Sequence, residues 1–119
     1  MSQNTVREVS PEEAKRQLDA GRILLVDVRE PHEYQAERIH GALLFPLKTF
    51  DPSAIPSDEE RELVFHCGTG KRSLDAAQRC LAAGRPAAAH VTGGLKAWRE
   101  AGLPTVSIDP STGQVVDQR

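Results

Sequence analysis

Two near-continuous apolar runs, RILLVDV at residues 22–28 and RELVFH at residues 61–66, constrain the fold more than any other feature of this sequence. Each run has the length of a β-strand. Neither run alternates apolar with polar side chains, as a strand with one solvent-exposed face does. Runs of this kind are typical of parallel sheets that are covered on both faces. We therefore expect helices to pack against both sides of a mostly parallel sheet.

Helical and extended segments alternate around these runs. The segment SPEEAKRQLDAG carries a capping Ser10, an early Pro11 and a terminal Gly21, which predict a helix. The other expected elements, in chain order, are an opening strand at 5–10, a short helix at 30–39, a short buried strand at 40–47 ended by Pro46, a surface connection at 51–60, a helix from Ser73 to Gly84, a strand at 87–94 and a helix at 95–104. This alternation predicts an α/β domain with a mostly parallel central sheet flanked by helices on both faces.

Length, charge and cysteine content narrow the class of protein. We expect one domain over residues 1–104 and a C-terminal tail over 105–119 that is a hairpin, an oligomer arm or a disordered end. A net charge of -2 with both signs intermixed predicts no nucleic-acid or membrane partner, and the two cysteines are too few for a disulfide framework. The opening segment has no apolar core like that of a signal peptide, so we expect a soluble, cytoplasmic protein.

The segment HCGTGKRS at residues 66–73 places a cysteine where a strand is expected to meet a helix. In open α/β sheets, ligands bind outside the carboxyl ends of the strands, where loop amides and the next helix N-terminus favour negative charge. In such a setting the pKa of Cys67 would fall from ~8.5 into the range of ~3.5 to 7.5, so that a thiolate nucleophile forms near neutral pH. Ser73 is expected to cap the helix that follows.

The loop residues after Cys67 are expected to bind a small, anionic, electrophilic substrate. The two glycines let the backbone turn its amides inward as a nest, the threonine adds a hydroxyl, and the two cations steer an anion towards the sulfur. The residues with these expected roles are Gly68, Thr69, Gly70, Lys71 and Arg72.

Two phosphate-binding patterns fit this loop less well. A nucleotide-binding P-loop needs a glycine where Phe65 stands and a serine or threonine directly after the lysine, where Arg72 stands. Tyrosine-phosphatase-type sites follow C-x5-R, whereas the spacing here is C-x4-R and Ser73 occupies the place of the phosphatase arginine. That shift would displace bidentate phosphate binding.

Four ordered segments make the chain resemble a single-domain rhodanese, a member of the sulfurtransferase family, over roughly residues 5–104. LLVDVREPHEY resembles the family's D-x-R-x-x-x-E-[YF] segment, and IHGALLFPL resembles I-x-G-A-x-x-x-P. HCGTGKRS resembles the C-x-x-G-x-R-S loop, and VTGGLKAWREAGLP resembles the closing L-x-G-G-x-x-x-W segment. In that family, a six-residue loop starting at the cysteine cradles one extra sulfur, whereas phosphatase-like relatives have seven residues.

The resemblance implies a rhodanese-like fold and a reaction. The Cys67 thiolate would attack the outer sulfur of thiosulfate or a similar sulfane donor, release sulfite and become a persulfide. Loop amides would hold the persulfide's charge until cyanide or a thiol, including a protein thiol, removed the sulfur. The resemblance implies no cofactor.

The resemblance also bears on residues outside the loop. It places Asp27 and Arg29 near the loop as supporting residues, which we interpret as a structural ion pair. Two-domain sulfurtransferases often carry an arginine near the position of Glu33, so a weaker donor affinity is an open alternative here. Many family members have Gly-His where this chain has Glu37 and Arg38, a change expected to affect a turn.

The remaining histidines and the second cysteine are expected to be structural. His66 precedes the nucleophile but should point to the opposite face, as a buried, hydrogen-bonded histidine. Cys80 is expected to be a core thiol, too far along a helix to pair with Cys67. The other histidines show no metal-ligand spacing, so we expect no metal site; they are His32, His40 and His90.

Three functions stay open, of which a sulfurtransferase or persulfide carrier is favoured. A cysteine-dependent phosphatase or arsenate reductase is disfavoured by the short loop, and a non-catalytic rhodanese-like binding module by the intact Cys67. The physiological donor and acceptor, the pathway and the oligomeric state are left open by the sequence.

Overall fold

The computed structural model describes residues 5–56 and 60–118. The described residues form, in chain order, β1 (Arg7–Val9), α1 (Pro11–Asp19), β2 (Ile23–Asp27), α2 (Pro31–Ala36), β3 (Glu37–Arg38), β4 (Leu43–Leu44), the 3-10 helices η1 (Leu47–Thr49) and η2 (Pro52–Ala54), β5 (Glu62–His66), α3 (Lys71–Ala82), β6 (Ala89–Val91), α4 (Gly94–Glu100), β7 (Val106–Ile108) and β8 (Val115–Asp117). Part of the expected surface connection, residues 57–59, lies outside the described residues, as do the chain ends at 1–4 and 119.

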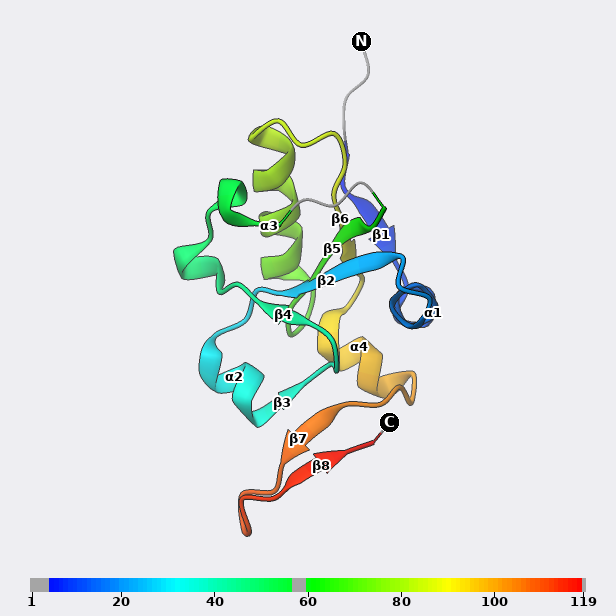
Figure 1. The fold of residues 1–119 in the computed structure, drawn as a ribbon, viewed down its shortest axis with the longest axis vertical. Helices are drawn as coiled ribbons and strands as arrows, with labels where there is room; N and C mark the ends of the chain where they lie inside the picture. The colour runs from blue at the N-terminus through cyan, green and yellow to red at the C-terminus, as the bar shows by residue number, and fades with distance from the viewer. Residues whose placement is uncertain (1–4, 57–59, 119) are drawn as a thin grey trace.

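The main sheet has the strand order β1-β6-β5-β2-β4, and all its neighbouring strands are parallel. Helix α3 packs on one face of this sheet, and α1 and α4 lie on the other (Figure 1). Because the strands are parallel, their carboxyl ends meet at one edge, and Asp27 of β2 is paired in register with His66 of β5. The predicted α/β fold with helices on both faces is confirmed.

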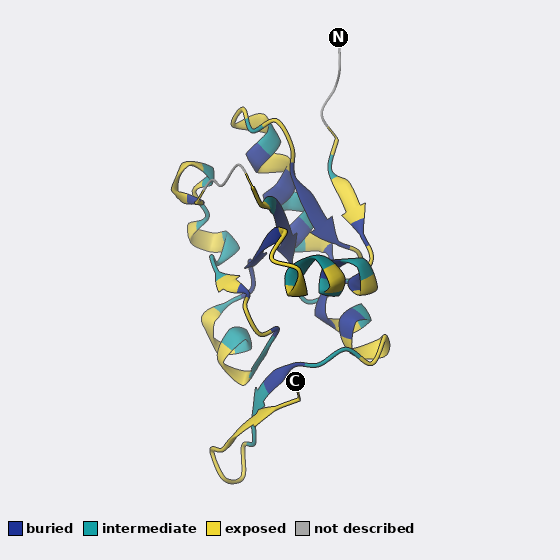
Figure 2. Ribbon diagram, turned by 45° about the vertical axis from the view of Figure 1, so that its right-hand side comes forward, coloured by how far each residue is buried: buried dark blue, intermediate teal, exposed yellow. Residues whose placement is uncertain are grey.

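The two apolar runs became β2 and β5 because both of their faces are covered. In β2, Ile23 and Leu25 pack in the core that contains Trp98 of α4, whereas Leu24 and Val26 pack in the core under α3. Figure 2 shows the central strands mostly buried. Alternate side chains thus serve opposite cores, and a run without polar alternation results.

The predicted bounds of two elements were wrong. The strand expected at 40–47 is only β4, at the edge of the sheet, where Leu43 is 42% exposed rather than buried. Helix α3 begins at Lys71 with Gly70 as its N-cap, so Ser73 does not cap the helix but lies buried in its first turn. Gly70 has a φ of 105°, a left-handed conformation that glycine adopts without steric cost, which moves the helix start into the loop.

Residues Glu37 and Arg38 form strand β3 where a turn was expected. The structure pairs β3 antiparallel with β7, and β7 with β8, in a second sheet with the order β3-β7-β8. Residues 106–117, in the segment expected as a tail, therefore form a hairpin, which lies at the lower end of the molecule in Figure 1. The division of the chain at residue 104 stays a prediction.

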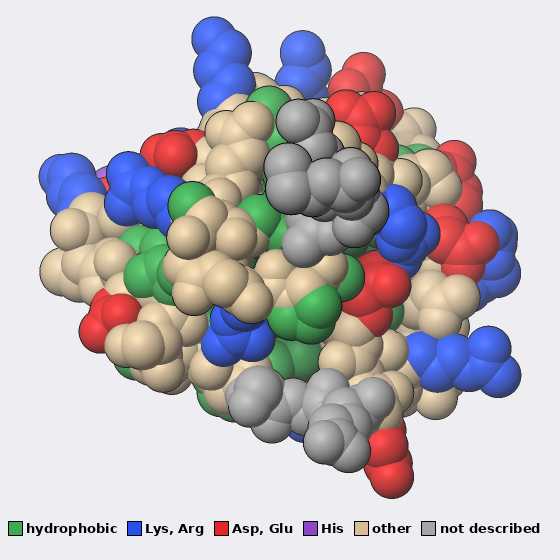
Figure 3. Space-filling view, turned by 90° about the horizontal axis from the view of Figure 1, so that it is seen from above, with side chains coloured by type: hydrophobic (Ala, Val, Ile, Leu, Met, Phe, Trp, Pro, Cys, Tyr) green, Lys and Arg blue, Asp and Glu red, His purple; other side chains and the backbone are tan. Residues whose placement is uncertain are grey.

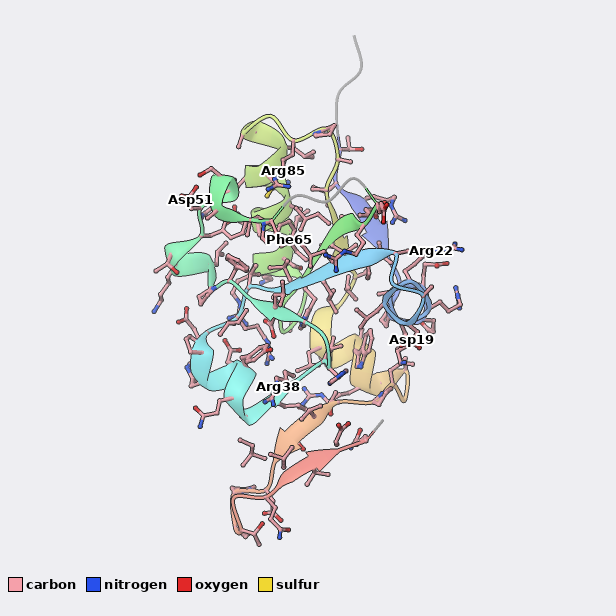
Figure 4. The ribbon with its side chains drawn as sticks, in the orientation of Figure 1. Asp19, Arg22, Arg38, Asp51, Phe65 and Arg85 are labelled. Carbon is pink, nitrogen blue, oxygen red and sulfur yellow. The ribbon has the colours of Figure 1, made fainter. Side chains whose placement is uncertain are left out.

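The connection between β4 and β5 is held to the end of α3 by Arg85. Its guanidinium donates hydrogen bonds to the carbonyl oxygens of Pro52 and Ile55, at 3.2 and 2.7 Å, beside the segment that carries Asp51 (Figure 4). Phe65 of β5 contacts Phe50 edge-to-face. At the end of the molecule seen in Figure 3, basic and acidic side chains are interspersed, as the mixed charge of the sequence predicts.

Candidate functional site

The loop from Cys67 to Arg72 lies where β5 ends and α3 begins, at the carboxyl edge of the main sheet. Cys67 is only 1% exposed and belongs to the core under α3. Thr69 and Lys71 are exposed on the outer side of the loop. The sequence therefore predicted the position of the cysteine correctly, at the meeting point of a strand and a helix.

The sulfur of Cys67 lies inside a ring of hydrogen-bond donors. The backbone N–H groups of Gly70 and Ser73 donate to Sγ at 3.1 and 3.3 Å, and the thiol itself lies 3.5 Å from Ser73 Oγ. Burial acts to raise the pKa of Cys67, but the hydroxyl and amide of Ser73 and the amides of Gly70 and Thr69 outweigh it, so the pKa is lowered. The loop thus stabilises a thiolate.

Helix α4 fixes the loop from the other side. The N–H of Leu95 donates to the Cys67 carbonyl oxygen at 2.8 Å, and the N–H of Lys96 donates to that of Gly68 at 3.1 Å. A Cβ on Gly94, which has a φ of 60°, would lie 2.3 Å from the Cys67 carbonyl oxygen. Sequence reasoning quoted this Gly-Gly pair as a motif but gave it no role in the site, which is to let α4 approach the loop backbone.

Ser73 connects the cysteine to a histidine that sequence reasoning set aside. Ser73 Oγ lies 2.9 Å from Nδ1 of His90 and 3.2 Å from the Gly70 carbonyl oxygen, so its single hydroxyl proton can be donated to either acceptor. His90, in β6, is 4% exposed, and burial lowers its pKa while Glu8 partly offsets this. No local sequence pattern could reveal this contact, because the pairing of β5 with β6 creates it.

Arg72 is held by a carboxylate from α2. Its guanidinium forms a bidentate pair with Glu33, with N–O distances of 2.7 and 3.1 Å. The hydrogen bond from Arg72 is the main cause that lowers the pKa of Glu33 to about 2, and the same bond raises the pKa of Arg72. The charge of Arg72 is therefore matched by Glu33, a partner that the sequence did not indicate.

Asp27 and Arg29 form a buried ion pair at the ends of β2 and the following turn. Arg29 donates to both carboxylate oxygens of Asp27, with 2.8 Å to Oδ2, and also to the Glu37 carbonyl oxygen at 2.6 Å. His66 is buried, and its Nε2 lies 3.4 Å from Asp27 Oδ2. Neither ring nitrogen has a hydrogen-bond partner among the described residues, so the hydrogen-bonded part of that prediction was wrong.

The second cysteine is separate from the site. Cys80 is buried in α3 among core residues, and burial raises its pKa. Both cysteines are free thiols. In the described parts of the chain, no three His, Cys, Asp or Glu residues gather in a way that would hold a metal ion, and no helix is long and apolar enough to cross a membrane.

The chain is similar to known proteins over most of its length. A family model described as a rhodanese-like domain matches residues 10–101. The chain is 45% identical over 91 residues to the uncharacterized protein slr1261 of Synechocystis. The matched segment makes up 76% of this chain but only 50% of that protein. It is 34% identical over 105 residues to a protein named sulfurtransferase from Allochromatium vinosum, covering 86% of this chain and 96% of that one. The rhodanese-like domain of the Anabaena Alr3790 protein has the same fold, with a TM-score of 0.74 at 24% identity over 88% of this chain and 82% of that one.

Proposed function

Because the chain belongs to the rhodanese-like domain family, we propose that it is a sulfurtransferase that carries a sulfane sulfur on Cys67. One observation carries this proposal: Sγ of Cys67 accepts hydrogen bonds from the backbone N–H groups of Gly70 and Ser73. These donors stabilise negative charge without any movement of side chains, which suits both a thiolate and a persulfide.

The proposed reaction has two displacement steps. The Cys67 thiolate attacks the outer sulfur of thiosulfate, a new S–S bond forms, and the S–S bond of the donor breaks so that its electron pair leaves with sulfite. A Cys67 persulfide anion results. Cyanide or a thiolate then attacks the terminal sulfur, and the electron pair of the Cys67 S–S bond returns to Cys67. The thiolate is regenerated without a cofactor.

The pairing of Arg72 with Glu33 supports sulfur rather than phosphate as the group carried. A phosphatase of this type needs its arginine free to bind phosphate through two parallel N–H groups. Here both terminal nitrogens of Arg72 already bind the two carboxylate oxygens of Glu33. The six-residue loop from Cys67 to Arg72 agrees with this, since an amide of the loop and the amide of Ser73 just after it both donate to a single sulfur atom.

The charges around the loop suggest the kind of substrate. Lys71 is exposed on the outer side of the loop that holds Cys67 and would attract a small anionic sulfur donor. We extend to this chain the sulfurtransferase activity named for its Allochromatium relative, with cyanide, a small thiol or a protein thiol as acceptor. A cytoplasmic location belongs to the same proposal.

Intact mass of the reduced protein before and after thiosulfate tests this function. We expect the parent and a Cys80→Ala variant each to gain one sulfur atom, and a Cys67→Ala variant to gain none. Addition of cyanide should then remove the sulfur. If the parent gains no sulfur from thiosulfate or from a polysulfide, sulfur transfer is wrong, and turnover of an aryl phosphate would point instead to the phosphatase alternative.

A further inference from the structure

A chain of contacts leads from the buried sulfur to a histidine on another strand. The Cys67 thiol lies 3.5 Å from Ser73 Oγ, and Ser73 Oγ lies 2.9 Å from His90 Nδ1. The other ring nitrogen of His90, Nε2, lies 4.0 Å from the carboxylate of Glu8. Two side chains that are each at most 4% exposed, Ser73 and His90, thus connect the nucleophile to an exposed carboxylate on β1.

The buried position of Cys67 creates the need for such a connection. Its thiol must lose a proton to become a nucleophile, yet the residue is 1% exposed. His66 is the neighbour of Cys67 in sequence, but its Nε2 lies 3.4 Å from Oδ2 of Asp27. Asp27 in turn forms an ion pair with Arg29. Ser73 is the side chain whose hydroxyl the thiol contacts.

We propose that Ser73 passes the proton of the Cys67 thiol to His90, which leaves a thiolate and an imidazolium. The S–H bond breaks as its proton bonds to Ser73 Oγ, while the original Ser73 hydroxyl proton bonds to His90 Nδ1. No atom is oxidised or reduced, and the serine ends as it began. Afterwards the Ser73 hydroxyl donates to the thiolate, and Nδ1–H of His90 donates to Ser73 Oγ. His90 acts on the sulfur only through Ser73, so it is a positioning residue for this proton.

The surroundings of His90 suit this role. Burial lowers its pKa, so while Cys67 is a thiol the ring is neutral and Nδ1 can accept a proton. Nε2 has no hydrogen-bond partner among the described residues, and the carboxylate of Glu8, the register partner of His90 on β1, lies 4.0 Å from it. Glu8 and the new thiolate would both stabilise the imidazolium.

The other charged side chains near the sulfur either favour the thiolate or are paired with a group of opposite charge. Arg72, at the end of the loop, favours the thiolate but is paired with Glu33 of α2. From β2, Asp27 is paired with Arg29. The backbone N–H groups of Gly70 and Ser73 also contact the sulfur, but they do not accept a proton, whereas the Ser73 hydroxyl leads on to His90.

This inference rests on the proposed function, because it describes how the same cysteine is activated.

The first test of the proton path measures the pKa of Cys67 through the ultraviolet absorbance of its thiolate. The proteins compared are the parent, Ser73→Ala, His90→Asn and the double variant. Asn donates a hydrogen bond but takes up no proton. We expect each single substitution to raise the pKa of Cys67 by about one unit, and the double variant to raise it no further, because both remove the same path. His40→Asn, which replaces an exposed histidine, is the matched control.

A second test does not depend on changing the buried histidine. We expect the pKa of His90, followed by NMR of its ring, to be lower by about one unit in Cys67→Ala than in the parent, because the thiolate no longer stabilises the imidazolium. An unchanged thiolate pKa in His90→Asn, additive shifts in the double variant, or an equal pKa of His90 in the two proteins would each overturn the proposal. At alkaline pH, His90→Asn should still gain a sulfur atom from thiosulfate, so failure of the proton path is distinguishable from failure of sulfur transfer.

Discussion

Two buried polar clusters lie at the carboxyl edge of one sheet, and they differ in the interactions that hold their side chains together. The charge cluster, Asp27, Arg29 and His66, holds an ion pair and a histidine whose ring nitrogens have no hydrogen-bond partner among the described residues. The sulfur cluster, Cys67, Ser73 and His90, is a chain of hydrogen bonds. The comparison teaches that sequence adjacency is a poor guide to the nucleophile's partners: the histidine beside Cys67 contacts Asp27, whereas a histidine on the next strand reaches Ser73.

The clusters should also differ in what they contribute. A buried ion pair is costly to break because the remaining charge loses its partner in a medium of low dielectric. A neutral hydrogen bond contributes less to folding but can change the protonation of the group it touches. We therefore expect the charge cluster to govern stability and the sulfur cluster to govern the chemistry of Cys67.

The largest expected effect is that of Asp27→Asn on stability. Loss of the carboxylate leaves Arg29 buried and unmatched, so the free energy of unfolding should fall by roughly 3–5 kcal/mol. Chemical denaturation measures this, with Asp75→Asn as a control that removes the exposed Asp75–Arg79 pair and should cost under about 1 kcal/mol. Molecules that remain folded should still load sulfur. If they do not, the two clusters are not separate.

The second effect is that of Gly94→Ala, which tests whether the sulfur cluster depends on the backbone of α4. The added methyl would overlap the Cys67 carbonyl oxygen, so the loop must shift and sulfur loading should fall at least about tenfold. The free energy of unfolding should fall by roughly 3 kcal/mol more than it does in the control variant. Gly102→Ala is that control, because Gly102 also has a positive φ but has nothing within 4 Å of a new Cβ. Equal loading by the two variants would contradict this role of Gly94.

The third effect concerns acid stability and the charge cluster. Burial lowers the pKa of His66, so below the unfolded pKa of about 6.5 the unfolded chain binds a proton that the folded protein does not. Stability should therefore fall as the pH drops below about 6.5, and His66→Leu should make this fall shallower without removing it, since burial also lowers the pKa of His90. Thermal unfolding from pH 7 to pH 5, with His40→Leu as control, measures the slope. A slope equal to that of the parent would show that His66 is not the group involved.

The smallest expected effect is that of Glu33→Gln, which frees Arg72 beside the sulfur cluster. An unpaired guanidinium should attract the anionic donor, so kcat/KM for thiosulfate should rise a few-fold at low salt and less at high salt. Glu12→Gln, an exposed change on α1, removes the same charge away from the loop. A decrease would instead mean that Glu33 holds Arg72 in the geometry the loop needs.

The features predictable from the sequence are those determined by local pattern. The two apolar runs indicated strands buried on both sides, and the cysteine, glycines and cations of the loop indicated an anion-holding turn before a helix. Residues 10–101 match the family expected from four short motifs. Each of these depends on residues close together in the chain.

The features that escaped prediction depend on register between distant segments. His90 meets Ser73 because β6 pairs with β5, and Glu33 meets Arg72 because α2 lies against the loop; neither relation has a local pattern. Glu37 and Arg38 extend as β3 because β7 supplies a partner strand. Helix α3 starts early because a left-handed glycine caps it where a serine was expected.

The burial of Cys80 has a consequence for oxidative stress. Cys80 lies nine residues into α3 from Lys71, about 13 Å along the helix axis, and its side chain is enclosed in the core. If peroxide converts Cys67 to a sulfenic acid, no second thiol of this chain can reach it to form a protective disulfide. Recovery would require an outside thiol, so the redox state of the surrounding thiol pool should decide how long the protein stays active during oxidation.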